Sequence, residues 1–119
     1  MQSCIMTSVL IIDDDQEAID NLSSYLRMHK IQVFGTASDG AYALELYEKH
    51  KPDFIISDYQ MPKRDGLYVI ESIKKAYPKC KIVLISGFAT AEIKLQSFAS
   101  GVSVLEKPVN NEELLSLLK

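Results

Sequence analysis

The stretch VLIIDDDQEA, residues 9–18, places three consecutive aspartates directly after four aliphatic residues. An unbroken aliphatic run is typical of a strand that is buried on both faces, and aspartate is a good cap for the start of a helix. The stretch therefore predicts a strand that passes at once into a helix. It does not by itself explain why three negative charges are crowded together.

This strand-to-helix unit recurs along the chain. Short β-branched runs lie at 8–12, 31–35, 53–57, 81–85 and 102–105. They alternate with stretches of apolar residues at helical spacing, near 19–26, 41–47, 67–73, 93–98 and 114–118. Such alternation is the pattern of a parallel sheet with helices on both faces. We therefore expect a single α/β domain with a doubly wound sheet of five parallel strands. The expected helix caps are Asp15 or Asp14, Ser38 or Asp39, Thr90 and Asn110.

Composition limits the classes of protein. The chain has 119 residues, 47% of them hydrophobic and 24% charged, which is typical of one globular domain. A net charge of −3, with lysine and arginine scattered along the sequence, argues against a nucleic-acid surface. No apolar run approaches the roughly 20 residues of a membrane helix, and the amino terminus lacks the pattern of a signal peptide. We expect a cytoplasmic protein with no direct contact to nucleic acid or membrane.

Polar residues stand at the carboxyl ends of four predicted strands. Asp13–Asp15 follow the first strand, Asp58 the third, Ser86 and Gly87 the fourth, and Lys107 the fifth. In open α/β sheets the functional crevice lies outside these strand ends. The fold would therefore bring carboxylates, a hydroxyl and an ammonium group into one pocket.

Carboxylates that crowd together raise one another's pKa, so they persist as anions only beside a cation. Mg²⁺ is the natural candidate, because it prefers oxygen ligands and is commonly held by one or two carboxylates plus a phosphate. The acidic run Asp13–Asp15 alone could equally be a helix cap with surplus surface charge. The addition of Asp58 favours a magnesium site.

Four motifs in order carry a resemblance to a known family. SDYQMPKRDG, residues 57–66, has an aspartate followed by Met-Pro and Asp-Gly, and LIIDD, LISG and EKP occur at the ends of the first, fourth and fifth strands. With these motifs the chain resembles a response regulator receiver domain of two-component signalling, over roughly residues 7–118. The resemblance implies a (βα)5 flavodoxin-like fold.

The resemblance also implies roles for individual residues. Asp58 would be the phosphoacceptor, receiving a phosphoryl group from a histidine kinase, a phosphotransfer protein or a small donor such as acetyl phosphate. Mg²⁺ would be held by Asp13, Asp14, Asp58 and the backbone carbonyl of Gln60. Such a domain is a signalling domain and not an enzyme, because it catalyses only its own phosphorylation and dephosphorylation.

The remaining implied residues surround the phosphoryl group. Lys107 would pair with its oxygens, while Ser86 and Gly87 would bind it from the fourth strand. The family often has a cis peptide bond at the position of Lys107–Pro108. Many members carry an aromatic residue where this chain has Val104.

The expected organisation is a receiver domain over residues 1–119, with a core at about 7–118 and no effector domain in this chain. Phosphorylation would switch the surface formed by the fourth helix, the fifth strand and the fifth helix. Beyond the kinase, the resemblance leaves room for an output domain, a downstream protein, or a homodimer that forms on phosphorylation.

Two other functions are compatible with parts of the sequence. A haloacid dehalogenase-type phosphohydrolase would use Asp13 and Asp15 in its Asp-x-Asp signature, but Glu17 stands where that family has threonine or valine. A flavodoxin-like binding module without phosphorylation would fit the strand pattern. It lacks a glycine-rich phosphate loop, since the glycines are dispersed.

Overall fold

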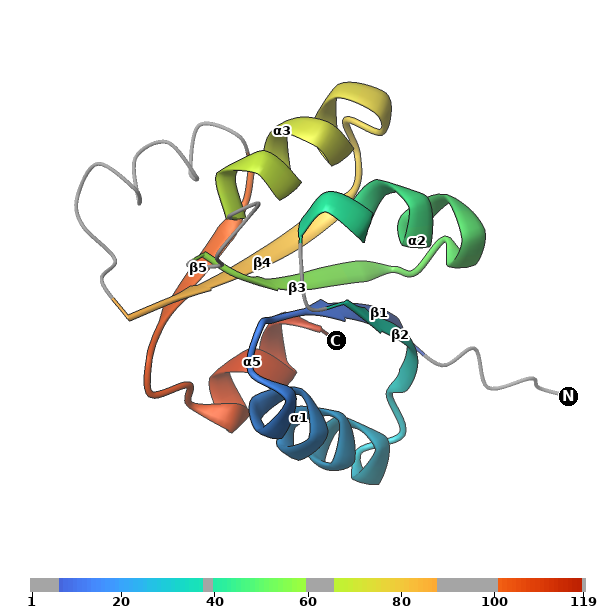
Figure 1. Ribbon diagram of the computed structural model, residues 1–119. Helices are drawn as coiled ribbons and strands as arrows, with labels where there is room; N and C mark the ends of the chain where they lie inside the picture. Colours follow the sequence, from blue (N-terminus) through green and yellow to red (C-terminus); the bar gives the residue numbers. More distant parts are fainter. Residues whose placement is uncertain (1–6, 38–39, 60–65, 88–100, 119) are drawn as a thin grey trace, which may run out of the picture.

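The computed structural model describes residues 7–37, 40–59, 66–87 and 101–118 (Figure 1). Its strands are β1 (Ser8–Ile12), β2 (Gln32–Ala37), β3 (Phe54–Asp58), β4 (Lys81–Ser86) and β5 (Ser103–Glu106). Its helices are α1 (Gln16–Met28), α2 (Ala43–His50), α3 (Gly66–Ala76) and α5 (Asn111–Leu117), with a short 3₁₀ turn η1 (Gly40–Tyr42) before α2. The helix expected near 93–98 lies outside the described residues. None of the described helices is long and apolar enough to cross a bilayer.

The strands form one parallel sheet in the order β2-β1-β3-β4-β5. This order is that of the flavodoxin-like doubly wound fold, so the predicted α/β architecture is confirmed. The order reverses between β1 and β3, which places the expected crevice at the carboxyl ends of these two strands. β3 ends one residue later than predicted, so that Asp58 is the last residue of the strand rather than the first residue of a loop.

The core has two layers, one on each face of the sheet. Leu10 and Ile12 of β1 pack in the layer covered by α2 and α3, whereas Val9 and Ile11 pack in the layer covered by α1 and α5 (Figure 1). Because both faces are covered, every residue of β1 is buried. This explains why the strand reads as a continuous aliphatic run instead of an alternating one.

Two of the predicted helix caps are confirmed. The Asp15 side chain accepts hydrogen bonds from the backbone N–H groups of Glu17 and Ala18 at the start of α1, and the Asn110 side chain accepts one from Glu113 at the start of α5. The caps expected at 38 or 39 and at 90 lie outside the described residues. Each observed cap satisfies backbone donors that the helix itself leaves unpaired.

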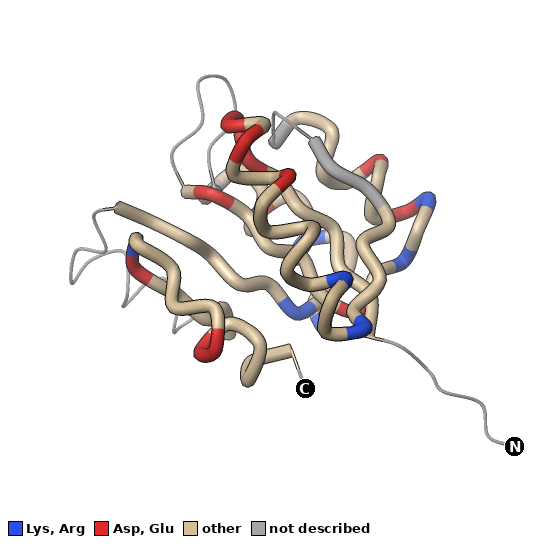
Figure 2. The backbone as a smooth tube through the Cα atoms, turned by 90° about the horizontal axis from the view of Figure 1, so that it is seen from below, with Lys and Arg blue, Asp and Glu red and all other residues tan. Residues whose placement is uncertain are grey.

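Basic residues that are scattered in the sequence gather at one edge of the fold. They lie at or just after the carboxyl ends of helices on both faces, and just before or at the start of β4, so they surround the amino ends of the strands (Figure 2). The members are Arg27, Lys30, Lys49, Lys51, Lys74, Lys75, Lys79 and Lys81. Cations at helix carboxyl ends complement the helix dipole. Of the basic residues that the structure describes, only Lys107 lies at the opposite edge, beside Asp58.

Ser23 is a polar residue on the buried side of α1. It is 5% exposed, and its hydroxyl has no hydrogen-bond partner. An unsatisfied buried hydroxyl is costly, so Ser23→Ala should raise the free energy of unfolding by about 1 kcal/mol. Urea denaturation measures this change. Ser24→Ala on the exposed side of α1 is the control, because it gives the same gain in helix propensity without removing a buried hydroxyl. Equal stability changes in the two variants would contradict the prediction.

Candidate functional site

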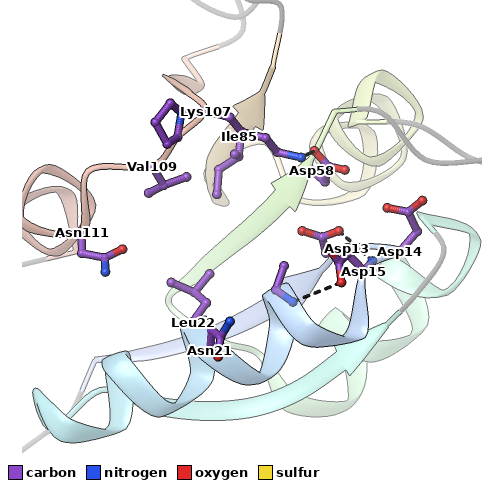
Figure 3. Close-up of a pocket in the computed structure, with 12 residues that line it drawn as sticks. Asp13, Asp14, Asp15, Asn21, Leu22, Asp58, Ile85, Lys107, Val109 and Asn111 are labelled. Carbon is purple, nitrogen blue, oxygen red and sulfur yellow. Dashed lines mark hydrogen bonds and ion pairs between the residues drawn. The ribbon is translucent and has the colours of Figure 1, made fainter.

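A pocket of about 740 Å³ opens at the carboxyl edge of the sheet, where the strand order reverses (Figure 3). One end of the pocket is polar and is formed by Asp13, Asp14, Asp15, Asp58 and Lys107. The other end extends along α1 toward the segment before α5. The sequence predicted that residues following β1, β3, β4 and β5 would share one pocket. The five side chains from β1, β3 and β5 do line it, whereas Ser86 and Gly87, which follow β4, are not among its lining residues.

Asp58 is a buried carboxylate beside a cation. Its side chain is 3% exposed, and Oδ1 lies 3.1 Å from Nζ of Lys107, which is 45% exposed. The backbone N–H of Lys107 donates to the carbonyl of Ser86 at 2.9 Å, which fixes the start of the loop after β5. The Lys107–Pro108 peptide bond is cis, as the resemblance implies. The carboxylate therefore faces the pocket with one positive charge next to it.

The carboxylates of Asp13, Asp14 and Asp58 form a tight cluster. One oxygen of each lies within 4.8 Å of the others. Burial raises the pKa of Asp13 to about 6, and the negative charge of Asp58 adds to this rise. The hydrogen bond from the backbone of Asp15 and the charge of Lys107 act in the opposite direction. The cluster thus carries more negative charge than its surroundings stabilise.

The same aspartate cluster changes the pKa of Lys107. Partial burial lowers its pKa, but the hydrogen bond to Asp58 and the charges of Asp58, Asp13 and Asp14 together raise it above the usual value for lysine. The ammonium group is therefore fully charged at neutral pH.

The donor atoms of this cluster fit Mg²⁺. They are carboxylate oxygens, the hard ligands that this ion prefers, and Asp14 is exposed enough to leave room for bound water. The pKa of Asp13 is raised mainly by burial and in part by the charge of Asp58, and a cation bound here would favour its charged form.

Two other predicted site residues lie at the same edge of the sheet. Ile85 pairs with Asp58 across β3 and β4, so Ser86 lies one residue beyond this pair, at the end of β4, and is completely buried. Gly87 follows it and is exposed, with nothing within 4 Å of the position where a Cβ would be. Gln60 lies outside the described residues.

The sequence interpretation did not find the second half of the pocket. Ala18, Asn21 and Leu22 of α1 line it, facing Val109 and Asn111 near the start of α5. The spacing of the three α1 residues, i, i+3 and i+4, places them on one helix face. That spacing, counted from the cap at Asp15, is the signal that could have identified them.

A family model described as the response regulator receiver domain matches residues 9–119. Among relatives, the transcriptional regulatory protein PdtaR of Mycobacterium tuberculosis is 32% identical over 93% of this chain and 54% of its own length. The uncharacterized transcriptional regulatory protein YesN of Bacillus subtilis is 27% identical over 96% of this chain and 32% of its own length. This chain therefore spans about half or less of these relatives.

Solved structures of chemotaxis and response regulator proteins are also similar to this chain. The chemotaxis protein CheY4 of Vibrio cholerae has 32% identity and a TM-score of 0.86, with 95% of this chain and 96% of that chain covered. The signal receiver domain of the putative response regulator NarL from Mycobacterium tuberculosis has 29% identity and a TM-score of 0.85, with 94% and 92% covered. With the family match over nearly its whole length, this chain belongs to the response regulator receiver domains of two-component signalling.

Proposed function

We propose that this receiver domain accepts a phosphoryl group on Asp58 from the phosphohistidine of a sensor kinase or phosphotransfer protein. The observation that carries the proposal is the ion pair of the buried Asp58 carboxylate with Lys107, 3.1 Å apart, beside two further carboxylates. A carboxylate held in a pocket next to a cation is suited to attack a phosphoryl group whose charge must be neutralised.

The chemistry is a single displacement at phosphorus. One oxygen of Asp58 attacks, the bond between phosphorus and the imidazole nitrogen of the donor breaks, and its electron pair leaves with the imidazole. Lys107 supplies positive charge to the phosphoryl oxygens during transfer. The Ser86 hydroxyl and the Gly87 backbone, at the end of β4, would donate hydrogen bonds to the same oxygens.

Receiver domains generally use Mg²⁺ at an acidic pocket, and an aspartate cluster of this kind is present here. We propose that Asp13, Asp14 and Asp58 hold the ion, with the Gln60 carbonyl as the further ligand expected from the sequence. When bound, the ion neutralises negative charge on the transferred group. The two aspartates after β1 serve to hold it beside Asp58.

The wider function is part of the same proposal. Relatives that this chain matches are transcriptional regulators longer than this chain. We therefore propose that residues 1–119 act as the receiver for an output domain or a downstream protein. The switching surface would be the fourth helix, β5 and α5, and homodimers would form on phosphorylation. Cys80 is a free, buried cysteine, which is in keeping with the proposed cytoplasmic location.

The two alternative functions are not favoured, because residues 9–119 match the receiver family. The phosphohydrolase and the receiver nevertheless differ in a measurable way. A phosphohydrolase releases many equivalents of phosphate, whereas a receiver catalyses only its own phosphorylation and dephosphorylation.

The test is phosphorylation by a small donor. With acetyl phosphate or phosphoramidate and millimolar Mg²⁺, intact mass should rise by one phosphoryl unit per chain, and a chelator should prevent the rise. Rapid phosphate release with no phosphorylated form would support the phosphohydrolase instead. An unchanged mass with no phosphate release would contradict phosphoryl transfer altogether.

A further inference from the structure

We infer that Asp15 is a positioning residue for the magnesium site. Its side chain fixes the first turn of α1, and its backbone N–H in turn fixes the orientation of the Asp13 carboxylate. The inference rests on the proposed function, because it concerns how the cluster of Asp13, Asp14 and Asp58 is held ready for the ion.

Asp15 is held in place by the helix that it caps. Its Oδ1 accepts hydrogen bonds from the backbone N–H groups of Glu17 at 3.0 Å and Ala18 at 3.3 Å. Its carbonyl accepts a third, from Ile19 at 3.0 Å. Ile19 is in turn buried in the core. These contacts join an exposed aspartate to a rigid, packed helix.

The same residue contacts the cluster through its backbone. The N–H of Asp15 donates to Oδ1 of Asp13 at 2.9 Å. A hydrogen bond on one carboxylate oxygen restricts rotation of the whole group, so it determines where the other oxygen points. Figure 3 shows Asp13 between Asp15 and Asp58, with Asp14 beside them. Outer contacts that orient a metal ligand commonly contribute strongly to metal affinity.

A simpler interpretation is that Asp15 only stabilises α1. The chain provides a matched control for this, because Asn110 caps α5 in the same way, accepting from the N–H of Glu113 at 3.0 Å. No hydrogen bond joins Asn110 to the aspartate cluster within the part of the chain that the structure describes. A further interpretation is that the negative charge of Asp15 attracts the cation. Asp15→Asn distinguishes the effect of the cap from the effect of the charge, because asparagine caps a helix as well as aspartate does but is neutral.

The test measures the dissociation constant of Mg²⁺ by isothermal titration calorimetry in about 0.15 M salt, where distant charges are screened. Asp15→Ala should weaken binding roughly tenfold. The dissociation constant of Asp15→Asn should stay within about threefold of the wild-type value, since asparagine keeps the cap. Asn110→Ala should bind Mg²⁺ with the same affinity as the wild-type protein. Circular dichroism confirms that each variant is folded.

Three results would overturn the inference. These are unchanged affinity in Asp15→Ala, an equal loss in Asn110→Ala, or an equal loss in Asp15→Asn. The first would show that the contact does not orient Asp13, the second that helix stability alone matters, and the third that charge alone matters. Failure of the original protein to bind Mg²⁺ would instead contradict the proposed metal site, and the inference with it.

Discussion

Asp58→Asn is expected to abolish phosphorylation completely while leaving the protein folded. An amide oxygen is a poor nucleophile, but asparagine has the same shape as aspartate, so the buried position at the end of β3 stays filled. The change also removes one charge from the cluster with Asp13 and Asp14. Intact mass after treatment with acetyl phosphate and Mg²⁺ measures the effect.

The matched control is Asp53, the aspartate that immediately precedes β3 at the opposite edge of the sheet. It accepts hydrogen bonds from the backbone and the hydroxyl of Ser8 and does not line the pocket. Asp53→Asn should therefore accept one phosphoryl group, as the original protein does, even if it is less stable. A full mass increase in Asp58→Asn, or its loss in Asp53→Asn, would assign the phosphoacceptor elsewhere.

Asp13→Asn is expected to stabilise the metal-free protein at pH 7. The pKa of Asp13 is raised by burial and by Asp58 from 3.8 to about 6, so the folded state disfavours its charged form. A shift of this size corresponds to about 3 kcal/mol at full strength. Because Asp13 is partly solvent-exposed, we expect about half of this, near 1–2 kcal/mol.

The size of this effect depends on pH. Well below the unfolded pKa of 3.8, Asp13 is protonated in both states and does not affect stability. As the pH rises from about 3 to 6, the unfolded state ionises first and the penalty develops. It is complete above the folded pKa of about 6. The stability advantage of Asp13→Asn should therefore be fully present at pH 7 and much smaller at pH 4. Urea denaturation at both values checks this.

Magnesium should reverse the order of stability. At a concentration 100-fold above its dissociation constant, a ligand stabilises the folded state by about 2.7 kcal/mol. The original protein should gain this amount at pH 7, and Asp13→Asn should gain much less. If Mg²⁺ does not change the unfolding curve of the original protein, the assignment of Asp13 to the metal site is wrong.

The strands could be predicted from the sequence because strands buried on both faces are continuous aliphatic runs. β1 is covered on both faces, so its aliphatic run marks both of its ends, and the predicted and observed bounds agree at 8–12. α2 was predicted less well. Residues 41–47 carry apolar side chains at helical spacing, but η1 occupies Gly40–Tyr42 and the helix begins at Ala43. A 3₁₀ turn has nearly the same spacing of side chains, so the pattern does not separate the two.

Within the site, the sequence indicated the residues that follow directly from strand ends. Asp13, Asp58 and Lys107 break apolar runs, and parallel topology then brings them together. Asn21 and Asn111 were missed because a polar residue on a helix is usually only a solvated one. The bond from Asp15 to Asp13 was also missed, since it depends on backbone geometry at the cap.

Among the described residues, eight of the nine basic side chains lie at one edge of the sheet, whereas the aspartate cluster and Lys107 lie at the other, so charge is unevenly distributed over this part of the protein (Figure 2). Molecules with a net charge of −3 repel one another at long range, but the basic edge of one attracts the acidic edge of the next at short range. Such head-to-tail contacts leave both outer ends free, so they can extend into chains. The Debye length is about 30 Å at 0.01 M salt and about 8 Å at 0.15 M. In dilute buffer both the net repulsion and the attraction between unlike edges therefore act over a longer range, and at 0.15 M salt both are largely screened, so head-to-tail contacts through these edges should weaken as salt is added.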